Sequence, residues 1–257
     1  MSIHPTAIIH PKAQVAQSAQ IGPYCVVHEN VVIEENVRLD SHVVVDGWTT
    51  IGAGSRVHPF ASVGGDSQDL KFKGEKTLVK IGPNTTLREY VTVNGGTGEG
   101  TETVIGSGCH IMAYAHIAHN CIVGNNVVIA NCGTLAGHVT VADSVVIGGL
   151  VAIHQFCRIG TMSILGGCSK VIQDIPPFMM GDGHPAVVRG LNLVAMKRRQ
   201  VSEEAQKEIK QAFKLIYKSG LNTTNAVKEI KNQKFHTPEV QHLLQFISNS
   251  ERGISKP

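Results

Sequence analysis

Residues 117–134 read IAHNCI VGNNVV IANCGT, three units of six residues that each begin with an aliphatic side chain. The same spacing runs from Ile3 to Val63, from Ile81 to Val93 and from Ile105 to Val171. In these runs the first residue of every unit is Ile, Leu or Val, and the fifth is almost always small or β-branched. Such a hexapeptide repeat predicts a parallel β-helix, an all-β solenoid.

The repeat has a direct physical interpretation. Each hexad forms a short strand and a turn, the branched first residue points into a narrow core, and the small fifth residue fits at the corner. One hexad cannot bury its apolar face alone, so stacked coils must share a continuous core. Three hexads make one triangular coil in this class, and neighbouring coils lie about 4.8 Å apart.

The composition agrees with a thin prism. Aromatic residues make up only 5% of the 257 residues, hydrophobic residues make up 42%, and there are 27 glycines. The repeat starts at Ile3, with no charged segment followed by an apolar one, so no secretory signal is expected. No apolar run is long enough to cross a bilayer, and we expect no stable membrane insertion.

The six cysteines fall on the fourth and fifth positions of the repeat, where they replace small apolar residues. No C-x-x-C motif is present, which argues against a cysteine-based zinc site. Unpaired cysteines of this kind predict a reducing, cytoplasmic location.

Two breaks interrupt the repeat, at residues 69–80 and 99–104, and we expect a loop at each. Counting hexads places both breaks and three histidines, His119, His138 and His154, one full coil apart from one another. They should therefore share one edge of the prism, with neighbouring members roughly 5–8 Å apart. Loops above a row of histidines on a solenoid indicate a functional edge.

The repeat ends at Pro177, which predicts a β-helix over residues 1–177, a linker over 178–190 and a helical domain over 191–257. Helices are expected after Ser202, over about 224–232, and after the capping pair Thr237-Pro238. The basic cluster at residues 197–199 favours acidic small molecules or an acidic carrier protein. Nucleic acid is not expected, because no aromatic interleaving accompanies the cluster.

Seven motifs extend over nearly the full chain and are more specific than the repeat. They are Gln68-Asp69-Leu70-Lys71, His116-Ile117-Ala118-His119, Leu135-Ala136-Gly137-His138-Val139, His154-Gln155-Phe156-Cys157, Gly166-Gly167-Cys168-Ser169, Gln173-Asp174-Ile175-Pro176-Pro177 and Leu215-Ile216-Tyr217-Lys218-Ser219-Gly220. With them the chain resembles the bacterial UDP-N-acetylglucosamine acyltransferases. The resemblance implies a left-handed β-helix, a C-terminal helical domain and a homotrimer with active sites between subunits.

The resemblance also implies a reaction. An (R)-3-hydroxyacyl group would pass from acyl carrier protein to the 3-hydroxyl of UDP-N-acetylglucosamine, the first step of lipid A biosynthesis, with no cofactor and no metal. His119 would be the general base and the backbone N–H of Gly137 would stabilise the oxyanion. The implied substrate-binding residues are Gln68, Asp69, Lys71, His116, His138, His154, Gln155, Asn192, Arg198 and Arg199, and Gly167 would limit the acyl-chain length.

The chain departs from the family pattern beside the base. Asn120 follows His119 where the family commonly has aspartate, and an amide can orient an imidazole but supplies no charge. The acceptor could therefore be the 3-amino analogue, since an amine needs less help from a base. Val194 likewise replaces a carboxylate found in some members.

Three other interpretations remain open. A hexapeptide N-acyltransferase shares the fold and the carrier, but it usually carries an additional N-terminal domain. A γ-type carbonic anhydrase would use edge histidines as zinc ligands, but it would leave the 69–80 loop and the basic domain without a purpose, and metal analysis would identify it. A solenoid without chemistry would present a regular face, with no loops above the histidines.

Overall fold

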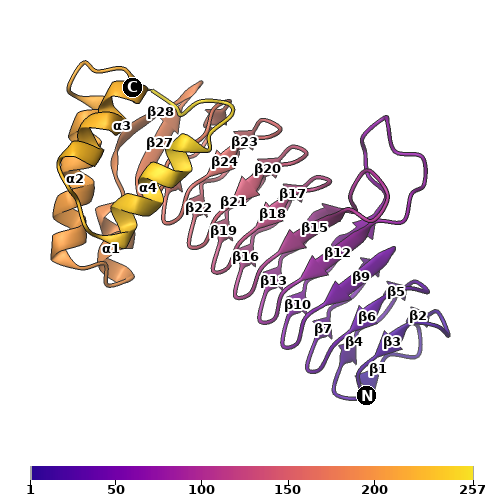
Figure 1. The fold of residues 1–257 in the computed structure, drawn as a ribbon. Coiled ribbons are helices and arrows are strands. Elements are labelled where there is room, and N and C mark those ends of the chain that lie inside the picture. Colours follow the sequence, from indigo (N-terminus) through magenta and orange to yellow (C-terminus); the bar gives the residue numbers. More distant parts are fainter. Residues whose placement is uncertain (1, 257) are drawn as a thin grey trace.

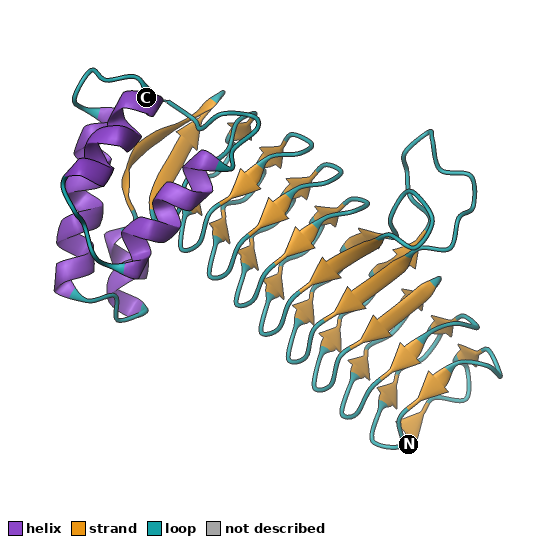
Figure 2. Cartoon of the chain, in the orientation of Figure 1, coloured by secondary structure: helices purple, strands orange, loops and turns teal. Residues whose placement is uncertain are grey.

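A computed structural model describes residues 2–256 as a long prism of short strands with helices at its C-terminal end (Figures 1 and 2). The strands form three sheets of 11, 9 and 8 strands, called here the first, second and third sheet. Apart from the final hairpin, each strand pairs in parallel with the strand of its own sheet in the next coil, as in β16 to β19. The parallel β-helix with three strands per coil is confirmed.

The strand bounds follow the hexads. The first sheet holds β1 (Ser2–Ile3), β4 (Gln20–Ile21), β7 (Arg38–Leu39), β10 (Arg56–Val57), β13 (Thr86–Leu87), β16 (His110–Ile111), β19 (Val128–Ile129), β22 (Val146–Ile147), β25 (Ile164–Leu165), β27 (Met179–Gly183) and β28 (Ala186–Leu191). The second holds β2 (Ile8–Ile9), β5 (Val26–Val27), β8 (Val44–Val45), β11 (Ser62–Gly65), β14 (Thr92–Asn94), β17 (His116–Ile117), β20 (Thr134–Leu135), β23 (Ala152–Ile153) and β26 (Lys170–Val171). The third holds β3 (Gln14–Val15), β6 (Val32–Ile33), β9 (Trp48–Ile51), β12 (Leu78–Ile81), β15 (Glu102–Ile105), β18 (Ile122–Val123), β21 (Thr140–Val141) and β24 (Arg158–Ile159).

The first residues of the hexads form the core, as predicted. Ile111, Ile129 and Ile147 are fully buried and directly opposed in register. At the corners, the fourth residue of the hexad commonly adopts a positive φ, for example 58° at Asn120 and 60° at His138. This left-handed backbone lets a tight corner carry a side chain outward, and it fits asparagine better than most residues.

The predicted loops at 69–80 and 99–104 are wrong at their C-terminal ends. Residues 78–80 belong to β12 and residues 102–104 to β15, and these two strands pair over four residues. Val79 and Thr103 are buried there, so the strands lengthen to cover more of the core. The long loop beside β12 still leaves the prism, as Figure 1 shows.

The predicted linker at 178–190 is also wrong. It contains β27 and β28, an antiparallel hairpin that adds to the first sheet through β25. Phe178, Met179, Ala186 and Val188 are buried, because the hairpin closes the open end of the core. The break in the hexad pattern at Pro177 is therefore not the end of the sheet, which continues in parallel through β27 and reverses direction only at β28.

The helices are α1 (Leu193–Arg198), α2 (Glu203–Tyr217), α3 (Thr223–Asn232) and α4 (Pro238–Ser248), and α1 was not predicted. Ser202 caps α2 as expected, accepting from the N–H of Ala205. Thr237 makes no capping bond, because its hydroxyl donates instead to the carboxylate of Glu208 on α2. No helix in residues 2–256 is long and apolar enough to cross a membrane.

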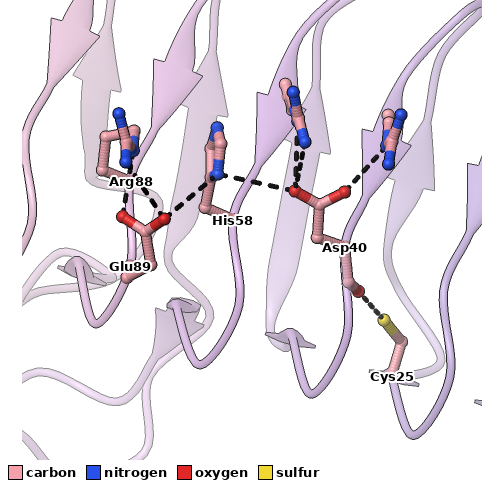
Figure 3. A network of polar contacts seen from close by, with 7 residues as sticks. Cys25, Asp40, His58, Arg88 and Glu89 are labelled. Carbon is pink, nitrogen blue, oxygen red and sulfur yellow. Dashed lines mark hydrogen bonds and ion pairs between the residues drawn. The ribbon is translucent and has the colours of Figure 1, made fainter.

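A polar network lies on the first sheet in the N-terminal half (Figure 3). His58 lies between two carboxylates, with Nδ1 at 3.5 Å from Asp40 and 3.4 Å from Glu89. Arg88 bonds Glu89 at 2.9 Å and lowers the pKa of that carboxyl to about 2. Burial, followed by the charge of Arg56, lowers the pKa of His58, so this ring is neutral at pH 7.

Candidate active site

His119, His138 and the bases of both loops lie along one corner of the prism. Strands β11, β14, β17, β20 and β23 are consecutive neighbours in the second sheet, and both loops leave from β11 and β14. His119 and His138 occupy the turns after β17 and β20, on adjacent coils, with ring centroids 5.2 Å apart. The register argument is confirmed for this pair. We call residues 119, 120, 137 and 138 the histidine corner.

The orientation of His119 is set by Asn120. Asn120 Oδ1 lies 2.8 Å from His119 Nδ1, and it also accepts the backbone N–H of Thr97 at 2.9 Å. Because an amide oxygen only accepts, His119 Nδ1 must carry the hydrogen. The neutral ring therefore presents a lone pair at Nε2.

Two groups surround that lone pair. A Cβ atom built on Gly137 would overlap Nε2 and Cε1 of His119, so the ring lies directly on the Gly137 backbone. The carboxylate of Asp69 faces Nε2 from the first loop, with Oδ2 at 3.8 Å, too far for a direct hydrogen bond. The His119 side chain is 12% exposed.

The two histidines beside His119 are uncharged at neutral pH. Burial lowers the pKa of His116, and the nearby His119 lowers it further, while His116 Nδ1 contacts the hydroxyl of Thr92 at 2.7 Å. Burial also lowers the pKa of His138, as does His119, while Asp69 acts in the opposite direction. Phe156, one coil further on, stacks on His138 with centroids 4.6 Å apart. Both rings can therefore offer neutral hydrogen-bonding groups.

The remaining loop and edge residues are open to solvent. His154 and Gln155 are exposed, and His154 Nδ1 donates to the carbonyl oxygen of Gln155 at 3.1 Å. Gln68 and Lys71 are exposed on the first loop, where the Lys71 N–H donates to Asp69 at 3.0 Å. These contacts leave the side chains of Gln68, Lys71 and Gln155 free to meet a ligand.

Other predicted residues lie elsewhere on the prism. Asn192, Arg198 and Arg199 line a cavity of about 610 Å³ over the outer face of the first sheet. Asn192 caps α1 through its oxygen and donates to the Met162 carbonyl at 2.8 Å, so its amide is already occupied. Gly167 follows β25, at the corner between the first and second sheets. Within one chain these residues are not brought to the histidine corner.

Sequence reasoning missed Thr97 and Phe156. Phe156 occupies the fourth position one coil beyond His138, so the same counting of hexads could have found it. Thr97 gave no signal, because it is a small residue at the fifth position of a hexad, where small residues are the rule.

Comparison with known proteins extends over the whole chain. The family profile "UDP N-acetylglucosamine O-acyltransferase; Domain 2" matches residues 174–255, and that of the bacterial transferase hexapeptide matches residues 30–65 and 102–137. The chain is 49% identical over 249 residues, 97% of its length and 90% of the relative's, to an acyl-[acyl-carrier-protein]–UDP-N-acetylglucosamine O-acyltransferase from Synechocystis sp.. It is 46% identical to the protein of the same name from Anaeromyxobacter sp., covering 100% of both chains.

Solved structures give the same result. LpxA from Acinetobacter baumannii superimposes with a TM-score of 0.94 at 42% identity, covering 98% of this chain and 99% of that one. The UDP-N-acetylglucosamine acyltransferase from Campylobacter jejuni gives 0.93 at 38% identity, with 100% of both chains covered. The left-handed parallel β-helix with a C-terminal helical part is thus confirmed.

Proposed function

The chain belongs to the acyl-[acyl-carrier-protein]–UDP-N-acetylglucosamine O-acyltransferase family, and we propose that it acylates the 3-hydroxyl of UDP-N-acetylglucosamine. It is an acyltransferase, and the transferred group is an (R)-3-hydroxyacyl chain delivered by acyl carrier protein. The sugar oxygen attacks the thioester carbonyl, an ester forms, and the carrier leaves as a thiol. This transfer is the first step of lipid A biosynthesis.

His119 is the general base in this proposal, and its contact with Asn120 is the observation that carries it. The bond from Nδ1 to Oδ1 leaves the Nε2 lone pair on the side of the ring that Gly137 and Asp69 border. A sugar hydroxyl between Nε2 and Asp69 would give its proton to His119 as its oxygen attacks. The imidazole would return this proton to the departing thiolate.

Gly137 supplies the oxyanion donor. Its N–H has no acceptor in the described part of the chain, and a Cβ at this residue would overlap the His119 ring. A free backbone donor next to the base meets the requirement for stabilising the tetrahedral oxyanion. A side chain at this position would displace the imidazole, which explains why glycine is required here.

The complete site requires more than one chain. The histidine corner lies between the second and third sheets, whereas Asn192, Arg198 and Arg199 lie over the first. In a homotrimer of prisms, the corner of one protomer can face the first sheet of its neighbour. The separation of the two groups of residues supports a homotrimer with active sites between subunits, in which Arg198 of a neighbour binds the diphosphate and Arg199 attracts the acidic carrier.

The location proposed is the cytoplasm. All six cysteines are free, including the exposed Cys168, which fits a reducing compartment.

One observation favours a second candidate for the atom that accepts the acyl group. Asn120 gives His119 a neutral hydrogen-bond partner, and no carboxylate bonds Nδ1. An amine nucleophile needs less proton removal than a hydroxyl, so the 3-amino analogue of UDP-N-acetylglucosamine is the second candidate acceptor.

The test combines both acceptors with a series of (R)-3-hydroxyacyl carrier thioesters. We expect transfer to the sugar by the wild-type protein and a loss of about 10²–10⁴-fold in His119→Ala. His10→Ala, an exposed histidine in the first coil, is the matched control. Near-normal turnover by a folded His119→Ala protein would exclude the assignment of the base.

A further inference from the structure

Two hydroxyl side chains, one from the loop after β11 and one from the loop after β14, contact each other. Ser67 Oγ and Thr97 Oγ1 lie 2.6 Å apart, although 30 residues separate them in the chain. Ser67 is 8% exposed, so this bond is largely shielded from water. Ser67 is new to the site, and Thr97 entered it above only through its backbone N–H.

Each of the two residues also contacts a different functional group, Thr97 through its backbone N–H and Ser67 through its hydroxyl. The backbone N–H of Thr97 donates to Asn120 Oδ1 at 2.9 Å, the same atom that accepts from His119. Ser67 Oγ accepts the backbone N–H of Asp69 at 3.2 Å, at the start of the segment whose carboxylate faces His119.

Together these contacts close a ring. It runs from His119 Nδ1 to Asn120, from Asn120 to Thr97, from Thr97 to Ser67, from Ser67 to Asp69, and from Asp69 back to His119 Nε2. The ring joins both nitrogens of the imidazole to both insertions. Within this ring, the Ser67–Thr97 bond joins the two loops directly, and His119 with Asn120 joins them through the imidazole.

The insertions do not need this link to stay folded. The Gly95 N–H donates to the Gly65 carbonyl at 2.9 Å, and Asn94 Nδ2 donates to the Asp66 carbonyl at 2.8 Å. These bonds join the loop bases where they leave β11 and β14. Removing one hydroxyl therefore breaks the ring while the bases remain attached.

We propose that Ser67 and Thr97 are a positioning pair, which holds the Asn120 amide and the Asp69 carboxylate on opposite sides of the His119 ring. The inference rests on the proposed function for its kinetic consequences. Without the pair, the Asn120 amide and the Asp69 carboxylate are coupled less tightly, and the imidazole is held less firmly in one tautomer and one orientation. A base displaced by a fraction of an ångström loses rate although every reacting group is present.

The first experiment is kinetic. Thr97→Val removes the hydroxyl with little change in shape, and we expect kcat to fall about 10- to 100-fold with a much smaller change in KM for the carrier. Thr97→Ser keeps the hydroxyl and should restore most of the rate. Thr77→Val is the matched control, because Thr77 is buried in the same pair of insertions and its hydroxyl bonds no group in residues 2–256. Wild-type kcat in Thr97→Val would overturn the proposal.

The second experiment separates positioning from a general loss of structure. In the His119→Ala background, Thr97→Val should lower the residual rate no further, because the pair acts through the imidazole. An equal loss with and without His119 contradicts the proposal. If Thr97→Val markedly lowers the midpoint of thermal unfolding, Ser67→Ala is used instead. It should also lower kcat, and it should have no further effect in the His119→Ala background.

The third experiment needs no activity. Nitrogen NMR of labelled histidine rings, with the His119 signal identified by its absence in His119→Ala, should show one tautomer protonated at Nδ1 in the wild type and a mixture in Thr97→Val. An unchanged His119 signal in Thr97→Val would overturn the proposal that Ser67 and Thr97 position the ring. A protein that shows the expected signals but acylates neither acceptor contradicts the proposed function and leaves the positioning pair supported.

Discussion

The imidazole of His119 lies on the backbone of Gly137, so closely that no side chain at position 137 would fit beside it. The contact joins two adjacent coils, since His119 follows β17 and Gly137 follows β20. The base and the proposed oxyanion donor thus come from neighbouring coils, and their separation depends on the regular spacing of the sheet.

Gly137→Ala tests this contact. Its Cβ would displace the imidazole, and we expect kcat to fall by at least about 10²-fold, since loss of an oxyanion donor alone costs that much. Gly190→Ala is the control, because a Cβ there meets nothing within 4 Å. Steady-state kinetics and thermal unfolding of both variants provide the check. An active Gly137→Ala protein with normal kcat would contradict the arrangement.

Asn120→Asp tests the partner of the base. A carboxylate can accept from both Thr97 and His119, as the amide oxygen does, and it adds a negative charge that favours the protonated imidazole. We expect the acidic limb of the pH–rate profile to move to higher pH, and turnover of the hydroxyl acceptor to rise relative to the amine. Identical profiles for wild type and variant would show that position 120 is not coupled to the base.

Gly167→Met tests the limit on chain length. A Cβ at Gly167 would lie 3.3 Å from the Gly149 carbonyl oxygen, so a side chain fits there after a small shift and would project from the corner. We expect the wild type to prefer long 3-hydroxyacyl chains and the variant shorter ones, because each buried CH₂ contributes about 0.8 kcal/mol. Competition among carrier thioesters of different length measures this. An unchanged preference in a folded variant would place the limit elsewhere.

Arg199→Glu tests recognition of the carrier. Arg198 and Arg199 are exposed beside the cavity over the first sheet, and neither has an ion-pair partner within residues 2–256. Attraction between exposed charges is screened over about 8 Å at physiological ionic strength. We expect KM for the carrier to rise with salt in the wild type and to rise further in Arg199→Glu. A KM for the carrier that does not change with salt would show that the carrier does not bind this surface.

His58→Gln tests the acid sensitivity of the fold. Because the pKa of His58 is lowered in the folded protein, the unfolded chain takes up a proton first as the pH falls below about 6.5. The contribution of neutral His58 to the free energy of unfolding, present above that pH, is then lost progressively as the pH falls. We expect the fall in thermal midpoint between pH 7.5 and 5.5 to be smaller in His58→Gln than in wild type, with the exposed His10→Gln as control. Equal falls in all three proteins would show that His58 contributes nothing.

The hexad pattern predicted most of the fold. Each coil contacts only its neighbours, so a local period of six sets the core residues, the strand register and the number of strands per coil. The same counting of hexads predicted that His119 and His138 share one corner. Capping residues and helical spacing indicated the helices after Ser202 and Thr237, although the Thr237 hydroxyl bonds Glu208 and makes no cap.

Only the tertiary structure decided what lies outside the repeat. Residues 178–190 gave no regular period, and the hairpin forms there because the open end of the core must be covered. The hexad period places Ser67 and Thr97 at fifth positions one coil apart, but it does not say which atoms bond. The ring from His119 through Thr97 and Ser67 to Asp69 depends on such side-chain contacts, whereas the repeat that carries them is local and could be identified from the sequence by itself.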